Sequence, residues 1–215
     1  VNNLTAIDQT TDTPTLNFAT INSLDNAQSS ATYSEGNLKW ATTTNSYYFW
    51  GRSTIGLSSG KWYAEFKLTS AAEHSVCGIC VDAPDDNTTF FASGSRNTAY
   101  EWGYKSSSGA KLNNDTESSY GDTYTTGDII SIALNLDDNE LKFYKNGTVQ
   151  NSGTAISITA VESTPTGNYF FCIGDRTSGT SVTWEANFGN PTFTGTDQSD
   201  GNSRGSFEYA PPSGY

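Results

Sequence analysis

Acidic residues are the first group in this sequence whose type and spacing could do chemistry. A glycoside hydrolase needs two neighbouring carboxylates, one of them with a raised pKa. Asp138 and Glu140 are two positions apart but belong to a turn-forming stretch, and Glu101 and Glu185 are single acids, each next to a tryptophan. No predicted aromatic strand carries two acids at alternating positions. We therefore expect solvated carboxylates here and predict that the protein is not an enzyme.

Oxygen donors and a histidine are the candidates for metal or nucleophilic chemistry. Asp82, Asp85 and Asp86 could bind Ca²⁺ through oxygen atoms, but their spacing differs from that of an EF-hand. A solvated polar loop is the simpler explanation, so no metal is predicted. His74 is the only histidine, and it follows Ala-Ala-Glu in a predicted loop, which argues against a Ser-His-Asp triad. No Gly-rich phosphate loop follows a predicted strand, so no cofactor is expected.

Three cysteines could in principle form a redox or metal site. Cys77 and Cys80 are three residues apart in a predicted strand, so their side chains should point to opposite faces. Cys172 lies in another apolar run. We therefore expect three reduced, buried thiols that act as small apolar groups. A disulfide between Cys172 and Cys77 or Cys80 would require their strands to be neighbours.

Aromatic residues grouped in polar stretches are the candidates for ligand binding. Adjacent aromatic side chains cannot all face one core in a strand, and exposed ones can stack on sugars or anchor a protein partner. The alternative is that they fill the second sheet or cover its edge. The candidate ligand-binding residues come from two stretches and are Tyr47, Tyr48, Trp50, Phe90 and Phe91.

Composition excludes several classes of partner. The 215-residue chain has a formal net charge of −12, and its 11 Lys and Arg residues are scattered singly. A nucleic-acid binder needs a basic footprint, so no nucleic acid is expected, and an anionic membrane surface is disfavoured for the same reason. No apolar run approaches the ~20 residues of a membrane span, so membrane insertion is not expected. No signal peptide is apparent, although the sequence begins at Val1 rather than Met.

The elements that must position these residues are short strands. Residues 127–149 predict a hairpin of two antiparallel strands, with Ile130, Ile132, Leu134 and Leu136 on one face. Asp137-Asp138-Asn139 form its turn, and Asn146-Gly147 is a second, tight turn. In residues 61–68 the side chains of Trp62, Ala64, Phe66 and Leu68 share one face, as in an antiparallel sheet with one wet side. Roughly ten such strands separated by turn signals predict an all-β sandwich.

Five motifs in register resemble the SPRY (B30.2-like) domain over about residues 33–193. The resemblance implies a concanavalin-like β-sandwich of two antiparallel sheets, used as a binding module. The motifs are Ser59-Gly60-Lys61-Trp62-Tyr63-Ala64-Glu65-Phe66, Cys77-Gly78-Ile79-Cys80, Trp102-Gly103-Tyr104, the hairpin of residues 127–147, and Trp184-Glu185-Ala186-Asn187-Phe188-Gly189.

A narrower resemblance concerns the flanks. Residues 12–20 and 34–38 resemble the lead-in of SPRY proteins from tailed phages, many of them marine, and residues 207–215 resemble the segment that follows their domain. This implies a virion part, such as a tail fibre, tailspike, or capsid fibre or decoration protein, and a chain that ends before the whole protein does. The division we expect is residues 1–30 as an N-terminal arm, 31–193 as the SPRY sandwich and 194–215 as a tail packing on or leaving it.

The sequence thus favours a non-enzymatic phage virion binding module, whose loops recognise a host-surface glycan or protein or other virion proteins. A fibre implies a homo-oligomer, and a trimer is expected. The location implied is the phage particle, and otherwise extracellular. Three alternatives remain open: a purely structural virion protein, a lectin-like cellular SPRY interaction domain, and, least favoured, a glycoside hydrolase.

Overall fold

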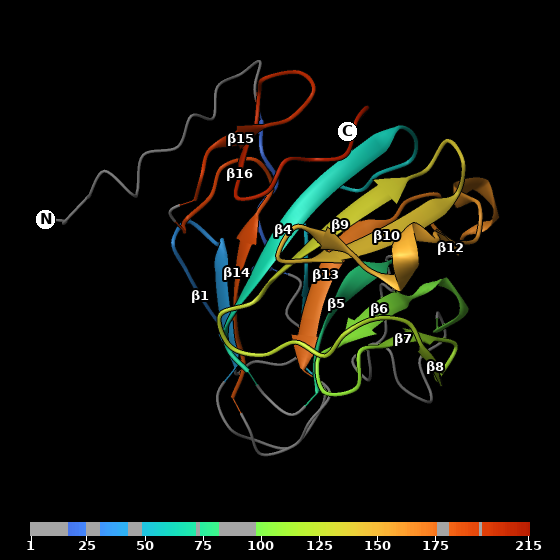
Figure 1. The fold of residues 1–215 in the computed structure, drawn as a ribbon, viewed down its shortest axis with the longest axis horizontal. Helices are drawn as coiled ribbons and strands as arrows, with labels where there is room; N and C mark the ends of the chain where they lie inside the picture. The colour runs from blue at the N-terminus through green and yellow to red at the C-terminus, as the bar shows by residue number, and fades with distance from the viewer. Residues whose placement is uncertain are drawn as a thin grey trace, which may run out of the picture.

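The protein is a sandwich of two antiparallel β-sheets, as predicted (Figure 1). The structure is a computed structural model that describes residues 17–24, 31–42, 49–71, 74–81, 98–175, 181–193 and 195–215. Tyr47, Tyr48, Phe90, Phe91, Asp82, Asp85 and Asp86 lie outside the described residues.

The larger sheet contains eight of the described strands. Its order is β1 (Ala31–Ser34), β2 (Lys39–Thr42), β14 (Thr183–Asn187), β4 (Lys61–Ser70), β9 (Ile129–Asn135), β10 (Glu140–Lys145) and β11 (Thr148–Val149), and β12 (Ile156–Ser157) also pairs with β10.

The second sheet contains six. Its order is β3 (Phe49–Arg52), β13 (Phe170–Asp175), β5 (Ser75–Cys80), β6 (Trp102–Lys105), β7 (Ala110–Asn113) and β8 (Thr116–Ser119).

Short elements complete the described structure. Three 3₁₀ turns are present: η2 (Thr98–Tyr100), η3 (Asn151–Gly153) and η4 (Val161–Ser163). A two-stranded ribbon of β15 (Gln198–Ser199) and β16 (Ser206–Phe207) lies beside β4 in Figure 1. The described part of the chain therefore consists almost wholly of strands and their connections.

The predicted hairpin of residues 127–149 is confirmed. β9 and β10 pair in register from Ile130↔Lys145 to Asn135↔Glu140. The next turn has Asn146 at φ +47° and Gly147 at φ +78°, a conformation that Asn and Gly adopt more readily than other residues. A two-residue connection therefore carries the chain from β10 into β11, as the Asn-Gly pair predicts.

The core lies between the sheets and contains many rings. Inward-facing residues of β4 and β9 meet those of β5, β6 and β13, and the largest fully buried side chains are Trp40, Trp184, Tyr104, Tyr169, Phe66 and Phe143. Aromatic side chains bury large areas each, which explains how a chain with 34% hydrophobic residues fills this core.

Three tyrosines fix the connection between β8 and β9 to the core. Tyr120 and Tyr124 pack against the Tyr104 ring with centroid distances of 5.6 and 5.1 Å. The Tyr124 hydroxyl donates to the Tyr104 carbonyl at 2.6 Å, and the Phe143 amide donates to the Tyr120 hydroxyl at 3.2 Å. The connection that follows the β7–β8 hairpin is therefore anchored to the core by aromatic rings.

Candidate functional site

Trp50 is a core residue, and its predicted role as an exposed ligand contact is wrong. It is 6% exposed and packs with Val76, Cys80, Leu112 and Cys172 in a second apolar cluster. The cluster forms because these residues share the face of the second sheet that points away from the main core. This is the alternative noted from the sequence, in which grouped aromatic residues cover the second sheet.

The strands that lead into the two aromatic stretches leave the second sheet at opposite ends. Phe49, which follows residues 43–48, pairs with Asp175 at the end of β13, whereas Cys80, which precedes residues 82–97, pairs with Phe170 at its beginning. The two stretches are therefore not attached to the same end of the sandwich, and the predicted ligand contacts at Tyr47, Tyr48, Phe90 and Phe91 stay a prediction.

The acids considered for catalysis have structural partners. Glu185 pairs with Lys39 at 3.1 Å, and Asp138 accepts a hydrogen bond from Asn135 Nδ2 at 2.7 Å. Glu101 is only 2% exposed. Asp138 lies in an exposed turn, as expected. Glu185 and Glu101 were expected on an exposed strand face, but Glu185 is partly buried in its ion pair and Glu101 is buried.

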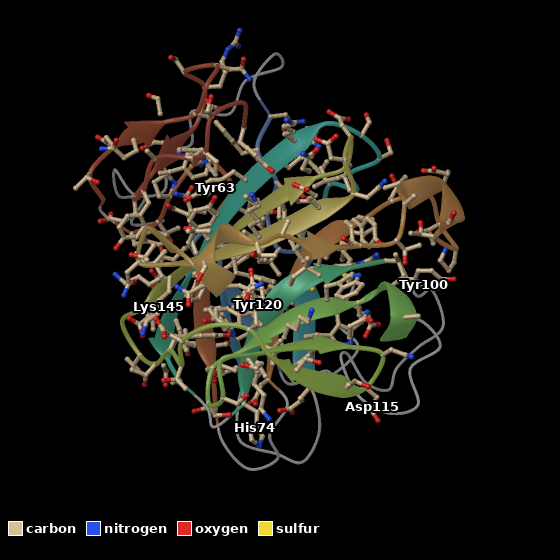
Figure 2. The ribbon with its side chains drawn as sticks, turned by 45° about the vertical axis from the view of Figure 1, so that its right-hand side comes forward. Tyr63, His74, Tyr100, Asp115, Tyr120 and Lys145 are labelled. Atoms are coloured by element: carbon tan, nitrogen blue, oxygen red, sulfur yellow. The ribbon has the colours of Figure 1, made fainter. Side chains whose placement is uncertain are left out.

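His74 lies near the start of β5, with its Nδ1 3.2 Å from the hydroxyl of Ser107 (Figure 2). Among the described residues no group of three His, Cys, Asp or Glu side chains could hold a metal ion. Within the same residues, no helix has the length and apolar character needed to cross a membrane.

The cysteines lie on opposite faces of the second sheet, as predicted. Cys77 faces the main core and its sulfur lies 3.9 Å from the Tyr124 hydroxyl, while Cys80 and Cys172 belong to the second cluster. β5 and β13 are neighbours, so the condition for a Cys80–Cys172 pair is met, and the two side chains are in contact. All three are nevertheless free thiols, and burial raises the pKa of Cys77 and of Cys172.

One end of the sandwich exposes apolar side chains. We call it the Trp62 end, comprising residues 53–60, Trp62 and the β9–β10 turn at residues 136–139. Trp62 is 43% exposed and Ile55 is 37% exposed. The predicted inward face of β4 therefore holds for Ala64, Phe66 and Leu68, which are buried, whereas Trp62, at the start of the strand, is partly exposed.

Hydrogen bonds hold the Trp62 end in one conformation. The Trp62 indole N–H donates to the Ser59 carbonyl at 2.7 Å. The Gly60 amide donates to Asp137 Oδ1 at 2.8 Å, and the Leu136 amide donates to the Gly60 carbonyl at 2.9 Å. The connection into β4 is thus tied to the hairpin tip, and the Trp62 ring is presented by rigid backbone.

A second concentration of polar side chains surrounds Glu65, which points outward from β4 but is fully buried. Its Oε1 accepts hydrogen bonds from the Tyr63 hydroxyl at 3.2 Å and the Tyr209 amide at 2.8 Å. Its Oε2 accepts from Asn187 Nδ2 at 3.0 Å and the Glu208 amide at 2.8 Å. Burial raises the pKa of the Glu65 carboxyl, and these four donors oppose that rise only in part.

Sequence patterns did not reveal this site. The alternation in residues 61–68 places Glu65 on the wet face with Lys61, Tyr63 and Lys67, which is correct for the direction of its side chain. That face is dry at Glu65 because residues 206–209 cover it (Figure 2, near Tyr63). The one available signal was an acid close to two aromatic residues, Tyr63 and Phe66, in a predicted strand, which is too common to be specific.

Comparison with known proteins identifies the family. The family model described as the SPRY domain matches residues 61–173, which is just over half of the chain. The chain belongs to the SPRY domain family. In this SPRY domain the matched region runs from the start of β4 to the middle of β13, so it includes Trp62 and Glu65 but not Asn187 or residues 206–209.

Curated relatives of this SPRY domain include Ran-binding proteins. It is 30% identical over 145 residues to Ran-binding protein 9 of Xenopus tropicalis, covering 66% of this chain and 24% of the relative. It is 29% identical over 140 residues to Ran-binding protein 10 of Danio rerio, covering 65% of this chain and 21% of the relative. The match thus spans about a quarter or less of each relative's length.

Solved structures share the fold. The SPRY domain of human HERC1 superposes with a TM-score of 0.60 at 15% identity, covering 77% of this chain and 96% of that domain. A stonustoxin structure gives a TM-score of 0.56 at 16% identity, covering 79% of this chain and 27% of stonustoxin. At these identities the likeness concerns the fold alone.

Proposed function

We propose that this SPRY domain is a non-enzymatic protein-interaction module that binds its partner through the Trp62 end. The observation that carries the proposal is the exposure of Trp62, 43%, on backbone fixed by hydrogen bonds. Tryptophan is enriched among the residues that dominate protein–protein binding energies, and a preorganised anchor loses little conformational entropy on binding. Ile55 adds apolar area at the same end.

A protein partner fits this end better than a sugar. Two polar groups beside Trp62 are already used within the domain: the Ser59 carbonyl accepts from the indole, and Asp137 Oδ1 accepts from the Gly60 amide. A sugar site needs polar groups that are placed to bind hydroxyls, beside the stacking ring. Membership of the SPRY family and the similarity to Ran-binding proteins also favour a protein partner.

The setting predicted from the flanking residues is a separate proposal. A phage virion, a trimeric fibre and a host-surface ligand depend on the resemblance of residues 12–20, 34–38 and 207–215, and the relatives named above, vertebrate Ran-binding proteins, lend them no support. The relatives' names supply one defined partner to test, Ran, although the matched region is a minor part of those proteins.

The test compares three forms of the domain: wild type, Trp62→Ala, and His74→Ala as a control substitution near the start of β5. Each is immobilised and exposed to purified Ran, to a library of extended peptides and to a glycan array. We expect wild type and His74→Ala to retain a protein or peptide ligand, and Trp62→Ala to bind it at least about tenfold more weakly.

Two outcomes would count against this function. Retention of glycans but no peptide or Ran would favour the lectin-like alternative. Binding of a peptide or Ran with equal affinity by wild type and Trp62→Ala would move the interaction to another surface of the domain. Circular dichroism of each variant shows whether the fold is kept, so a loss of binding is not mistaken for unfolding.

A further inference from the structure

The C-terminal segment, residues 205–215, is held on the outer face of the larger sheet mainly through its main chain. Glu65 accepts hydrogen bonds from two consecutive amides of the segment, with Glu208 on Oε2 and Tyr209 on Oε1, both at 2.8 Å. A single carboxylate therefore binds one peptide unit on each side of Glu208. Such a contact does not depend on the side chains that the segment carries.

Further main-chain groups of the segment are bound by the sandwich. Asn187 Nδ2 donates to the Ser206 carbonyl at 2.9 Å, and the Ser206 amide donates to the Gly189 carbonyl at 2.9 Å. The Tyr63 hydroxyl lies 3.5 Å from the Tyr209 carbonyl. Side chains and one backbone carbonyl of the domain thus form hydrogen bonds with the main chain of the segment. Proteins bind extended peptides through main-chain hydrogen bonds in the same way.

Two side chains of the segment add selectivity. Phe207 is 4% exposed, and its ring meets the Tyr63 ring edge to face at 5.0 Å and 82°. The Tyr209 ring lies over Gly147, where an added Cβ would come within 2.6 Å of its Cδ1. The site therefore accepts an extended chain with an aromatic residue at each of these two positions.

The connection to this segment is suited to exchange. Residues 201–204 form an exposed turn between β15 and β16, and the two strands share only two paired positions, Gln198↔Phe207 and Ser199↔Ser206. Release of the segment would return the buried Glu65 carboxylate to water, which offsets part of the lost hydrogen bonding. The raised pKa of Glu65 is consistent with that cost of burial.

We propose that the outer face around Glu65, Tyr63 and Asn187 is a binding site for an extended peptide, that residues 205–215 are its resident ligand, and that the same sequence supplied by another chain can replace them. This site is separate from the Trp62 end and does not depend on the function proposed there.

The experiment uses the full chain with a recognition sequence for a specific protease placed in the exposed turn at residues 201–204. After cutting, a fluorescent synthetic peptide of residues 205–215 is added in excess and its binding is followed by anisotropy. We expect the labelled peptide to replace the resident segment. Methylation of the Glu208 amide nitrogen, or Phe207→Ala in the peptide, should weaken binding at least about tenfold.

Matched controls separate peptide recognition from other effects. A Ser206→Ala peptide should bind within about threefold of the parent, because the Ser206 hydroxyl donates to Asp197 at 2.7 Å rather than to the sandwich face. His74→Ala in the cut chain should leave peptide exchange unchanged, because His74 lies near the start of β5 and contacts Ser107 rather than the segment. These arms alter only the peptide or a residue outside β4, so the folding of the Glu65 site is not in question.

Two results would overturn the proposal. If the labelled peptide never enters the cut chain, the segment is a fixed part of the fold. If the N-methylated and unmodified peptides bind with equal affinity, the hydrogen bond from the Glu208 amide to the Glu65 carboxylate does not contribute to binding.

Discussion

Glu65 is fully buried, yet all four of its hydrogen-bond partners are donors that favour the carboxylate form. Burial acts in the opposite direction and is the larger effect, so the carboxyl pKa is raised from its ordinary value of 4.5. Because the group binds its proton more tightly in the folded state, its contribution to stability is fully present below pH 4.5 and is lost as pH rises through the folded-state pKa.

The change Glu65→Gln tests this direction. Glutamine has a single acceptor oxygen, so at least one of the donors would face the amide nitrogen, and we expect the variant to be less stable by about 1–3 kcal/mol. That penalty should shrink between pH 4.5 and neutral pH, because the wild type alone loses the contribution of its bound proton. Urea unfolding of both proteins at several pH values measures the difference. A penalty that grows with pH would mean that the folded-state pKa is lowered.

Gly78 gives a second prediction at this scale. A Cβ at this position of β5 would lie 1.9 Å from the Trp102 carbonyl oxygen, which belongs to the backbone of β6. We expect Gly78→Ala to cost about 3 kcal/mol or more, because backbone has to move. Gly36→Ala is the control: its φ is +62° but nothing lies within 4 Å, so about 1–2 kcal/mol of backbone strain is expected. Similar costs for the two variants in thermal unfolding would refute the steric explanation.

At the scale of elements, the Asn146-Gly147 turn combines a backbone requirement with side-chain bonds. The Ile129 amide donates to Asn146 Oδ1 at 2.9 Å, and Asn146 Nδ2 donates to Asp128 Oδ1 at 2.6 Å. The side chain therefore links the turn to the beginning of β9. Lys145, on the strand before the turn, lies 3.6 Å from Asp128 and strengthens the same connection (Figure 2).

Asn146→Gly separates the two roles. Glycine keeps the positive φ of the turn but removes both side-chain bonds, so we expect a loss of about 1–2 kcal/mol in chemical unfolding. Asn139→Gly is the comparison, because Asn139 also has a positive φ, +56°, in the β9–β10 turn but makes no such bonds to β9 within the described residues. Its stability should change by less than about 1 kcal/mol. Equal losses at the two turns would show that φ alone matters.

Local elements were predictable from the sequence, and their neighbours were not. The β9–β10 hairpin follows from alternation and turn residues that are adjacent in the chain. No feature of the local sequence predicts that β14 lies between β2 and β4, or that Trp50 is buried. The Glu65 site could not be predicted for the same reason, because the amides of Glu208 and Tyr209 that bind it lie 143 and 144 residues further along the chain.

At the scale of the whole molecule, the two apolar clusters enclose every cysteine. Cys77, Cys80 and Cys172 are all buried, and burial raises the pKa of Cys77 and Cys172, which lowers their thiolate content. We expect none of the three to react with a disulfide reagent such as DTNB in the native state, and all three to react in denaturant. The reaction rate in native buffer should follow the opening of the sandwich. One fast-reacting thiol without denaturant would contradict this packing.

The strand order also governs how the chain can be made in a cell. β13 is inserted between β3 and β5, and β14 between β2 and β4, so the last long strands to be synthesised lie inside both sheets. Until β13 and β14 have been synthesised, the edges of the earlier strands carry unpaired backbone N–H and C=O groups that can pair with other chains. Strand pairing between residues so far apart in the sequence is also slow. We therefore expect a nascent chain of this SPRY domain to be prone to aggregation until β13 and β14 have left the ribosome, and a product that ends before β13 to aggregate or be degraded.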